Sequence, residues 1–163
     1  SPYYLNLIDT PGHIDFNYEV ERSLAACEGA LLLVDATQGV QAQTLGNLHL
    51  ARQQNLTIIP VINKIDLPQA QPEAVIKSLK QLVPESIQPI LLSAKTGQGV
   101  SQLPATIINS IPSPSGNTNA PLRALVFNSV FHPHLGVVAF IKVVDGSLSS
   151  SRLFLMQSLP IWV

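Results

Sequence analysis

Four short apolar runs constrain the fold of this chain more than any other feature of its sequence. They lie at residues 5–8, 30–34, 57–62 and 90–92, and each is apolar almost throughout rather than at every second position. A strand with one face in water alternates apolar and polar residues, whereas a strand buried on both faces does not. The runs therefore predict strands of a parallel sheet that is covered on both faces.

Helical patterns lie between and after these runs. Apolar residues recur at helical spacing in three stretches: Val20, Leu24 and Cys27; Ile76, Leu79 and Val83; and Leu103, Ile107 and Ile111. Strands that alternate with helices favour right-handed crossovers and helices on both faces of the sheet. We therefore expect an α/β domain of three layers that ends near Ile111.

The sequence pattern changes after residue 111. Residues 112–121, PSPSGNTNAP, are turn formers without an apolar stripe, which is the composition of a linker. The following LRALVFNSVF and GVVAFIKVVDGSL are typical of antiparallel strands, and Asp145-Gly146 offers a hairpin turn. We expect residues 1–111 to form the α/β domain, 112–121 the linker, and 122–163 the first part of an all-β barrel.

The composition limits the functions open to the chain. Its 163 residues are 46% apolar, with a formal net charge of −1, which is typical of a folded domain. No run approaches the ~20 apolar residues of a membrane span. The chain has no cluster of Lys or Arg, so charge gives no argument for nucleic-acid binding. Cys27 is the single cysteine, which excludes an internal disulfide.

Polar residues follow three of the runs. Open α/β sheets bind ligands at the carboxyl ends of their strands, so one ligand could contact all three loops. The candidate residues are Asp9, Thr10, Pro11, Gly12 and His13 after the first run, Asn63, Lys64 and Asp66 after the third, and Ser93, Ala94 and Lys95 after the fourth.

The loop after the first run suits a phosphate group. Asp9 is a hard oxygen ligand that could hold Mg²⁺ through water, and Gly12 lets a backbone N–H approach a phosphate oxygen. His13 lies where a water that attacks a terminal phosphorus must be oriented. Taken alone, Asp-Thr-Pro-Gly is also a common turn sequence, and His13 could equally be a solvated turn histidine.

The other two loops suit guanine. Asp66 can accept two parallel hydrogen bonds from N1 and N2 of guanine, whereas adenine would leave the carboxylate unpaired. Asn63 and the backbone around Ala94 can serve the other edge of the base. Lys64 and Lys95 have stems long enough to cover its two faces. Each motif alone could be an ordinary strand end, but the three in this order favour a nucleotide site.

These motifs resemble those of translational GTPases, with DTPGHIDF as switch II, NKID as the guanine-specificity motif and SAK as the last base-binding motif. EGALLLVDATQGVQAQT and NKIDLP narrow the resemblance, over residues 4–144, to the LepA type, elongation factor four, a ribosome-associated relative of elongation factor G. The family implies a P-loop-NTPase-like G domain, with Asp9 near Mg²⁺, Gly12 at the γ-phosphate and His13 orienting the hydrolytic water. It implies that guanine is held by Asn63, Lys64, Asp66, Ser93, Ala94 and Lys95.

The resemblance also implies ligands and partners. GTP, GDP and Mg²⁺ are the expected ligands, and the ribosome is the expected macromolecular partner, with peripheral membrane association at most. The expected location is the bacterial cytoplasm, with the mitochondrial matrix or the face of its inner membrane as the alternative.

The sequence departs from the family pattern at its start and after the linker. None of the nine glycines begins Gly-x-x-x-x-Gly-Lys-[Ser/Thr], and SPYY has neither an initiator Met nor a basic region. We therefore expect a chain truncated at its start and inactive by itself. NSVFHPHLG carries His132 and His134 where the family has aspartates, and two histidines do not make a metal site. The final LPIWV is expected to be non-native.

Two other expectations follow. The family places the strand that carries the phosphate loop between the first two runs. When that strand is missing, either residues 5–8 pair directly with residues 30–34, which we favour, or the segment up to about residue 28 detaches and residues 30–34 become an exposed apolar edge. Besides a GTPase fragment, two functions remain open. One is a GTPase-derived module that binds guanine nucleotide or a ribosomal partner without turnover, and the other is an α/β domain whose motifs are coincidental.

Overall fold

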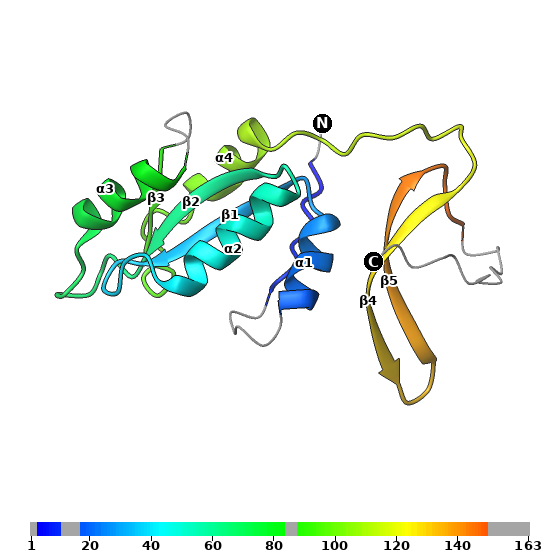
Figure 1. Cartoon of the computed structure of the whole chain (residues 1–163), viewed down its shortest axis with the longest axis horizontal. Coiled ribbons are helices and arrows are strands. Elements are labelled where there is room, and N and C mark those ends of the chain that lie inside the picture. Colours follow the sequence, from blue (N-terminus) through cyan, green and yellow to red (C-terminus); the bar gives the residue numbers. More distant parts are fainter. Residues whose placement is uncertain (1–2, 11–16, 84–87, 150–163) are drawn as a thin grey trace.

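A parallel sheet of three strands lies at the centre of the first part of the chain (Figure 1). The computed structural model describes residues 3–10, 17–83 and 88–149. Strands β1, β2 and β3 are neighbours in that order, and β4 pairs with β5 in a second sheet. The elements are α1 (Asn17–Ala25), β1 (Gly29–Asp35), α2 (Ala42–Gln53), β2 (Thr57–Asn63), α3 (Pro72–Leu82), β3 (Ile90–Leu91), α4 (Gln102–Ser110), β4 (Arg123–His132) and β5 (Gly136–Asp145).

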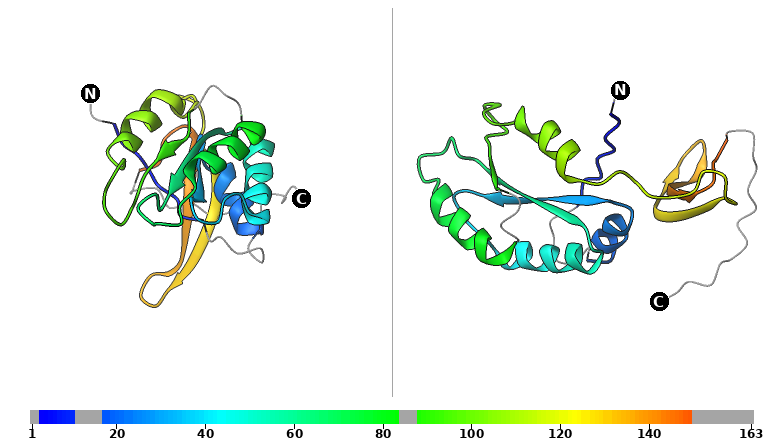
Figure 2. Two further views of the ribbon diagram at one scale, coloured as in Figure 1. Left: turned by 90° about the vertical axis from the view of Figure 1, so that its left-hand side faces the viewer. Right: turned by 90° about the horizontal axis from the view of Figure 1, so that it is seen from above.

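Helices cover both faces of the parallel sheet, as the apolar runs predict (Figure 2). On one face Leu79 of α3 and Leu48 of α2 pack against Ile62 of β2. On the other face Ile59 and Val61 of β2 pack against the apolar stripe of α4. Because side chains that point to opposite faces are both buried, β2 has no room for the polar alternation of a half-exposed strand. The prediction of parallel pairing is confirmed for β1, β2 and β3, and burial on both faces is confirmed for β2. The edge strand β1 differs, because Leu32 and Val34 are buried while Leu33, on its other face, is 60% exposed.

The first apolar run does not form a strand. Residues 3–10 contain no helix or strand, and the side chains of Leu5 and Leu7 are 53% and 86% exposed. Within the described residues β1 pairs with β2 alone and is therefore an edge strand. The predictions that residues 5–8 form a buried strand and pair with residues 30–34 are both wrong. An apolar run becomes a strand only where a neighbour satisfies its backbone groups, and composition does not reveal that neighbour.

The helices follow the predicted stripes with one addition. Val20 and Leu24 on α1 and Leu79 on α3 are buried, whereas Cys27 lies just beyond the end of α1 and is half-buried. The apolar pattern did not predict α2, because the buried side chains of α2 are only Leu48 and Ala51. Two buried residues make too narrow a stripe to separate a helix from a polar loop.

The second part of the chain contains an antiparallel hairpin, which confirms the two predicted strands. Its turn lies at residues 133–135 and is followed by Gly136, which has a φ of 73°. Asp145 ends β5, and any strand that pairs across Asp145-Gly146 would lie outside the described residues. The barrel therefore stays a prediction, as do the domain boundaries at residues 111 and 121.

Polar contacts attach the predicted linker and the residue before β1 to the hairpin. The Asn117 N–H donates to Oδ1 of Asp145 over 2.9 Å, and the Gly146 N–H donates to the Asn117 carbonyl over 2.9 Å. Lys142 of β5 forms an ion pair with Glu28, which precedes β1. The latter part of the linker is thus ordered by β5 rather than being a free connection.

Candidate functional site

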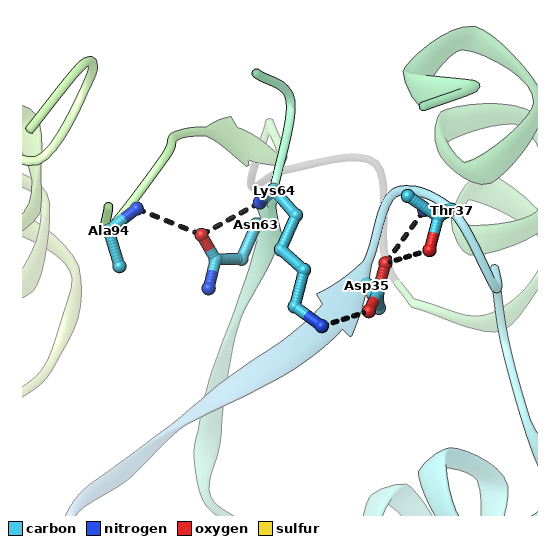
Figure 3. A network of polar contacts seen from close by, with 5 residues as sticks. All are labelled: Asp35, Thr37, Asn63, Lys64 and Ala94. Carbon is cyan, nitrogen blue, oxygen red and sulfur yellow. Dashed lines mark hydrogen bonds and ion pairs between the residues drawn. The ribbon is translucent and has the colours of Figure 1, made fainter. Parts of the chain in front are cut away.

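The side chain of Asn63 joins the loops that follow β2 and β3. Parallel pairing sets Ile62 beside Leu91, so both strands end at the same edge of the sheet. Oδ1 of Asn63 accepts hydrogen bonds from the N–H of Lys64 over 2.7 Å and from the N–H of Ala94 over 3.0 Å (Figure 3). The structure therefore brings the NKID and SAK motifs together. The pairing of β2 with β3 and the two hydrogen bonds of Asn63 fix the relative positions of the two motifs.

Ser93 shapes the second loop from inside. Its side chain is fully buried, and Oγ accepts a hydrogen bond from the Thr96 N–H over 3.2 Å. Its carbonyl accepts from Gly97, and its N–H donates to Gln98, each over 2.9 Å. The side chain of Ser93 thus supports the loop and does not reach solvent, whereas Ala94 and Lys95 are exposed.

Gly99 lets this loop return close to β3. A Cβ added to Gly99 would lie 2.2 Å from the carbonyl oxygen of Leu91, and the φ of Gly99 is 75°. Both the close approach and the left-handed backbone require glycine at this position. Gly99 was not among the predicted site residues, although the Gly-x-Gly spacing of TGQG after SAK is a turn signal.

Asp66 is the half-buried acid of the NKID loop. Within the described residues its carboxylate takes part in no hydrogen bond and no ion pair. A carboxylate at a strand edge with open acceptor positions can bind a ligand that offers paired N–H donors. Asp66 follows Asn63 by three residues in the sequence and lies in the loop that Asn63 contacts.

Asp35, at the end of β1, contacts the NKID loop through Lys64 and was not among the predicted site residues. Its Oδ1 accepts from the N–H and from Oγ1 of Thr37, each over 2.7 Å. Its Oδ2 lies 2.6 Å from the ammonium nitrogen of Lys64. The hydrogen bond from Lys64, followed by those from Thr37, lowers the pKa of Asp35 from 3.8 to about 2. The signal was available, because Asp35 follows the second apolar run just as Asn63 follows the third.

Lys64 combines an unusual backbone with a directed side chain. Its φ is 65°, in the left-handed region that non-glycine residues adopt rarely. Its side chain is 51% exposed and ends at the carboxylate of Asp35 (Figure 3). Strain of this kind persists where surrounding contacts hold the residue in place.

The structure does not link the predicted phosphate loop to these two loops. Asp9 is exposed and Thr10 is half-buried, and no hydrogen bond or ion pair joins either to another described residue. Pro11, Gly12 and His13 lie outside the described residues. The part of the chain that the structure describes has no group of three or more His, Cys, Asp or Glu side chains able to hold a metal. Asp9 therefore fits Mg²⁺ only as one carboxylate beside phosphate and water ligands.

His132 and His134 do not form a metal site among the described residues. Both side chains are exposed, and Nδ1 of His132 accepts a hydrogen bond from the His134 N–H over 3.2 Å.

In the described ranges, no helix has both the length and the apolar character needed to cross a membrane.

Comparison with known proteins shows the protein family to which the chain belongs. Residues 1–113 match the family described as the elongation factor Tu GTP binding domain, and the chain belongs to that family. Within this class the resemblance to the LepA type, elongation factor 4, is confirmed by curated relatives. Elongation factor 4 of Porphyromonas gingivalis is 55% identical over 147 residues, which are 90% of this chain and 25% of that protein.

Other bacterial relatives give the same result. Elongation factor 4 of Pseudarthrobacter chlorophenolicus is 55% identical over 157 residues, 96% of this chain and 25% of the relative. Elongation factor 4 of Geobacillus thermodenitrificans is 52% identical over 157 residues, 96% of this chain and 26% of the relative. The chain thus spans about a quarter of the length of the curated relatives it matches.

Proposed function

We propose that this chain binds guanine nucleotide through the loops after β2 and β3, and that the longer protein hydrolyses GTP to GDP and phosphate during translation elongation. One observation carries the proposal. Asn63 joins the two loops through a pair of hydrogen bonds, and the carboxylate of Asp66 beside them has no partner among the described residues. A preformed edge with open acceptors suits a base that presents adjacent donors.

We assign a role to each base-side residue, and the hydrogen bonds of Asn63 support this assignment. Asp66 accepts from N1 and N2 of guanine. Oδ1 of Asn63 is occupied by the two loops, which leaves its amide nitrogen to donate to the other edge of the base. The Ala94 N–H already donates to Asn63, so the next backbone N–H, that of Lys95, is the donor that remains. The stems of Lys64 and Lys95 cover the two faces of the ring, and Ser93 supports the loop from below.

The phosphate side of the proposal rests on the family resemblance. Thr10, Pro11 and Gly12 place a backbone N–H near the terminal phosphate, Asp9 holds Mg²⁺ through water, and His13 orients the attacking water. The metal ion supplies charge neutralisation on the phosphate oxygens when it is bound. We assign the ribosome as partner and the bacterial cytoplasm as location on the same basis, since the relatives are bacterial elongation factors.

A second candidate function is guanine-nucleotide binding without turnover. It concerns these 163 residues alone, which contain no Gly-x-x-x-x-Gly-Lys-[Ser/Thr] sequence. That motif supplies the Lys and the hydroxyl that meet the phosphates and Mg²⁺ in P-loop proteins. The two functions share the base-side loops and differ in whether GTP is consumed.

The substitution Asp66→Asn tests the base-side proposal. An amide donates where a carboxylate only accepts, and xanthine has a carbonyl where guanine has its N2 amino group. The unchanged chain should bind GDP more tightly than xanthosine diphosphate, and Asp66→Asn should reverse this order. Isothermal titration with both nucleotides measures the change.

Glu73→Gln is the matched control. Glu73 is an exposed acid in the first turn of α3 and belongs to neither loop, so its loss should leave the order of GDP and xanthosine diphosphate unchanged. An Asp66→Asn chain that still prefers GDP by the original ratio would remove Asp66 from base recognition.

A further inference from the structure

We propose that Asp35 is a positioning residue for base recognition, which fixes Lys64 so that the aliphatic stem of Lys64 forms one wall of the guanine site. The proposal rests on the proposed function and extends it to the end of β1. None of the motifs that indicate a nucleotide site includes Asp35. Its role follows from the geometry at the edge of the sheet (Figure 3).

The sheet register puts Asp35 next to the guanine motif. In the parallel pairing of β1 with β2, Asp35 lies opposite Asn63, the first residue of NKID. The residues on either side of Asp35, Val34 and Ala36, are 2% and 1% exposed. Asp35 is thus held on buried backbone, whereas Lys64 extends from an exposed loop.

The two carboxylate oxygens of Asp35 have different partners. Oδ1 accepts both hydrogen bonds from Thr37, which orient the carboxylate. Oδ2 is left for the ammonium group of Lys64, 2.6 Å away. The side chain of Asp35 is only 17% exposed, so the carboxylate is fixed before it meets Lys64. The carboxyl group also stays ionised through the neutral and mildly acidic range, because its pKa is lowered to about 2.

This arrangement changes what Lys64 can offer a ligand. A half-exposed lysine ordinarily samples many rotamers and loses that freedom when a ligand immobilises it. The ion pair with Asp35 selects one direction for the stem before nucleotide arrives. It also neutralises the ammonium group locally, so Lys64 contributes apolar surface to the base rather than charge to a phosphate.

A double-mutant cycle tests whether Asp35 acts through Lys64. The dissociation constants of GDP and ADP are measured by NMR titration for the unchanged chain, Asp35→Asn, Lys64→Met and the double variant. Asp35→Asn should weaken GDP binding about three- to tenfold, the range expected for a partly exposed charged contact. In the Lys64→Met background, Asp35→Asn should have no further effect, because the group it positions is gone.

Asp145→Asn is the matched control. Asp145 also ends a strand, accepts one backbone hydrogen bond from Asn117, and pairs with an exposed cation, Arg123, at 2.7 Å. It lies on the hairpin, so its loss should not change GDP affinity. If Asp35→Asn does not fold, Thr37→Val replaces it in the cycle, since it removes one hydrogen bond that orients Asp35. Its expected loss of GDP affinity is about twofold.

The outcomes separate this inference from the proposed function. Equal affinity of the unchanged chain for GDP and ADP would contradict guanine recognition itself. A clear preference of the unchanged chain for GDP, together with a GDP affinity that Asp35→Asn leaves intact, would overturn only the role of Asp35. Additive losses from Asp35→Asn and Lys64→Met would also overturn it, because Asp35 would then act independently of Lys64.

Discussion

The base side of the proposed site, the loops at residues 63–67 and 93–99, is held by the sheet, whereas the described part of its phosphate side, Asp9 and Thr10, is not. Both base-side loops leave buried neighbouring strands, and Asn63 bonds one to the other. Asp9 follows residues 3–8, where Leu7 is 86% exposed and no strand forms. The difference shows that a loop is held in a defined conformation when the strand before it is buried in a sheet.

This contrast has a consequence for binding. A loop that is already ordered loses little conformational entropy when a ligand arrives, so more of the contact energy appears as affinity. The base-side loops meet this condition through Asn63, Ser93 and Asp35. We therefore expect guanine recognition to dominate nucleotide binding by this chain, with the phosphates contributing little.

The largest expected effect is on stability, and it compares an apolar residue before a base-side loop with one before the phosphate-side loop. Ile62 is fully buried in β2 just before Asn63. Ile62→Ala should lower the unfolding free energy of the chain by about 2–5 kcal/mol. Leu7→Ala should change the unfolding free energy by less than about 0.5 kcal/mol, because its side chain is already in water. Urea unfolding measures both. A loss above about 1 kcal/mol for Leu7→Ala would indicate that residues 5–8 are packed, against the contrast drawn here.

The next effect concerns catalysis on the phosphate side. In a chain extended to the length of its relatives, His13→Ala should lower ribosome-stimulated kcat at least about tenfold, or ~1.4 kcal/mol of barrier, with GTP affinity nearly unchanged. Positioning a water acts on the transition state and not on ground-state binding. Steady-state hydrolysis with ribosomes measures kcat. Unaltered stimulated turnover would remove His13 from the catalytic role.

The smallest effect is the pH dependence of the Asp35 contacts. Folding lowers the pKa of Asp35 from 3.8 to about 2, so its contribution to stability is complete above pH 3.8 and is lost as pH falls toward 2. Because Lys64 is half exposed, we expect about 1 kcal/mol rather than the full value of the shift. Urea unfolding at pH 5 and at pH 2.5 should show this loss in the unchanged chain and not in Asp35→Asn. Equal losses in both chains would assign the acid sensitivity to other groups.

Sequence reasoning succeeded where local pattern and burial coincide. The runs at residues 57–62 and 90–92 are buried strands, and the motifs that follow them meet as the parallel sheet requires. Residues 5–8 carry the same apolar signal and are exposed, because a strand depends on a hydrogen-bonding neighbour that the pattern does not encode. The helix α2 was not predicted because it buries only two residues, so a real helix carries almost no apolar signal.

The site was predicted in part for similar reasons. A motif names residues close in sequence, so it points to Asn63 and Lys64 but not to Asp35, which joins them only through the β1–β2 register. Which partners a side chain has already taken is also invisible in sequence. Ser93 fits a base-contact motif, yet its side chain is fully buried beneath the loop.

The most direct test of the account is an NMR titration of the unchanged chain with guanosine, GDP and ADP. Because the base side is preformed, guanosine and GDP should bind within about threefold of each other. Both should shift the backbone amides of Lys64 to Leu67 and of Ala94 to Thr96, and ADP should bind at least about tenfold more weakly. ADP binding equal to that of GDP, or GDP binding more than about thirtyfold tighter than guanosine, would contradict the claim that the base-side loops carry recognition.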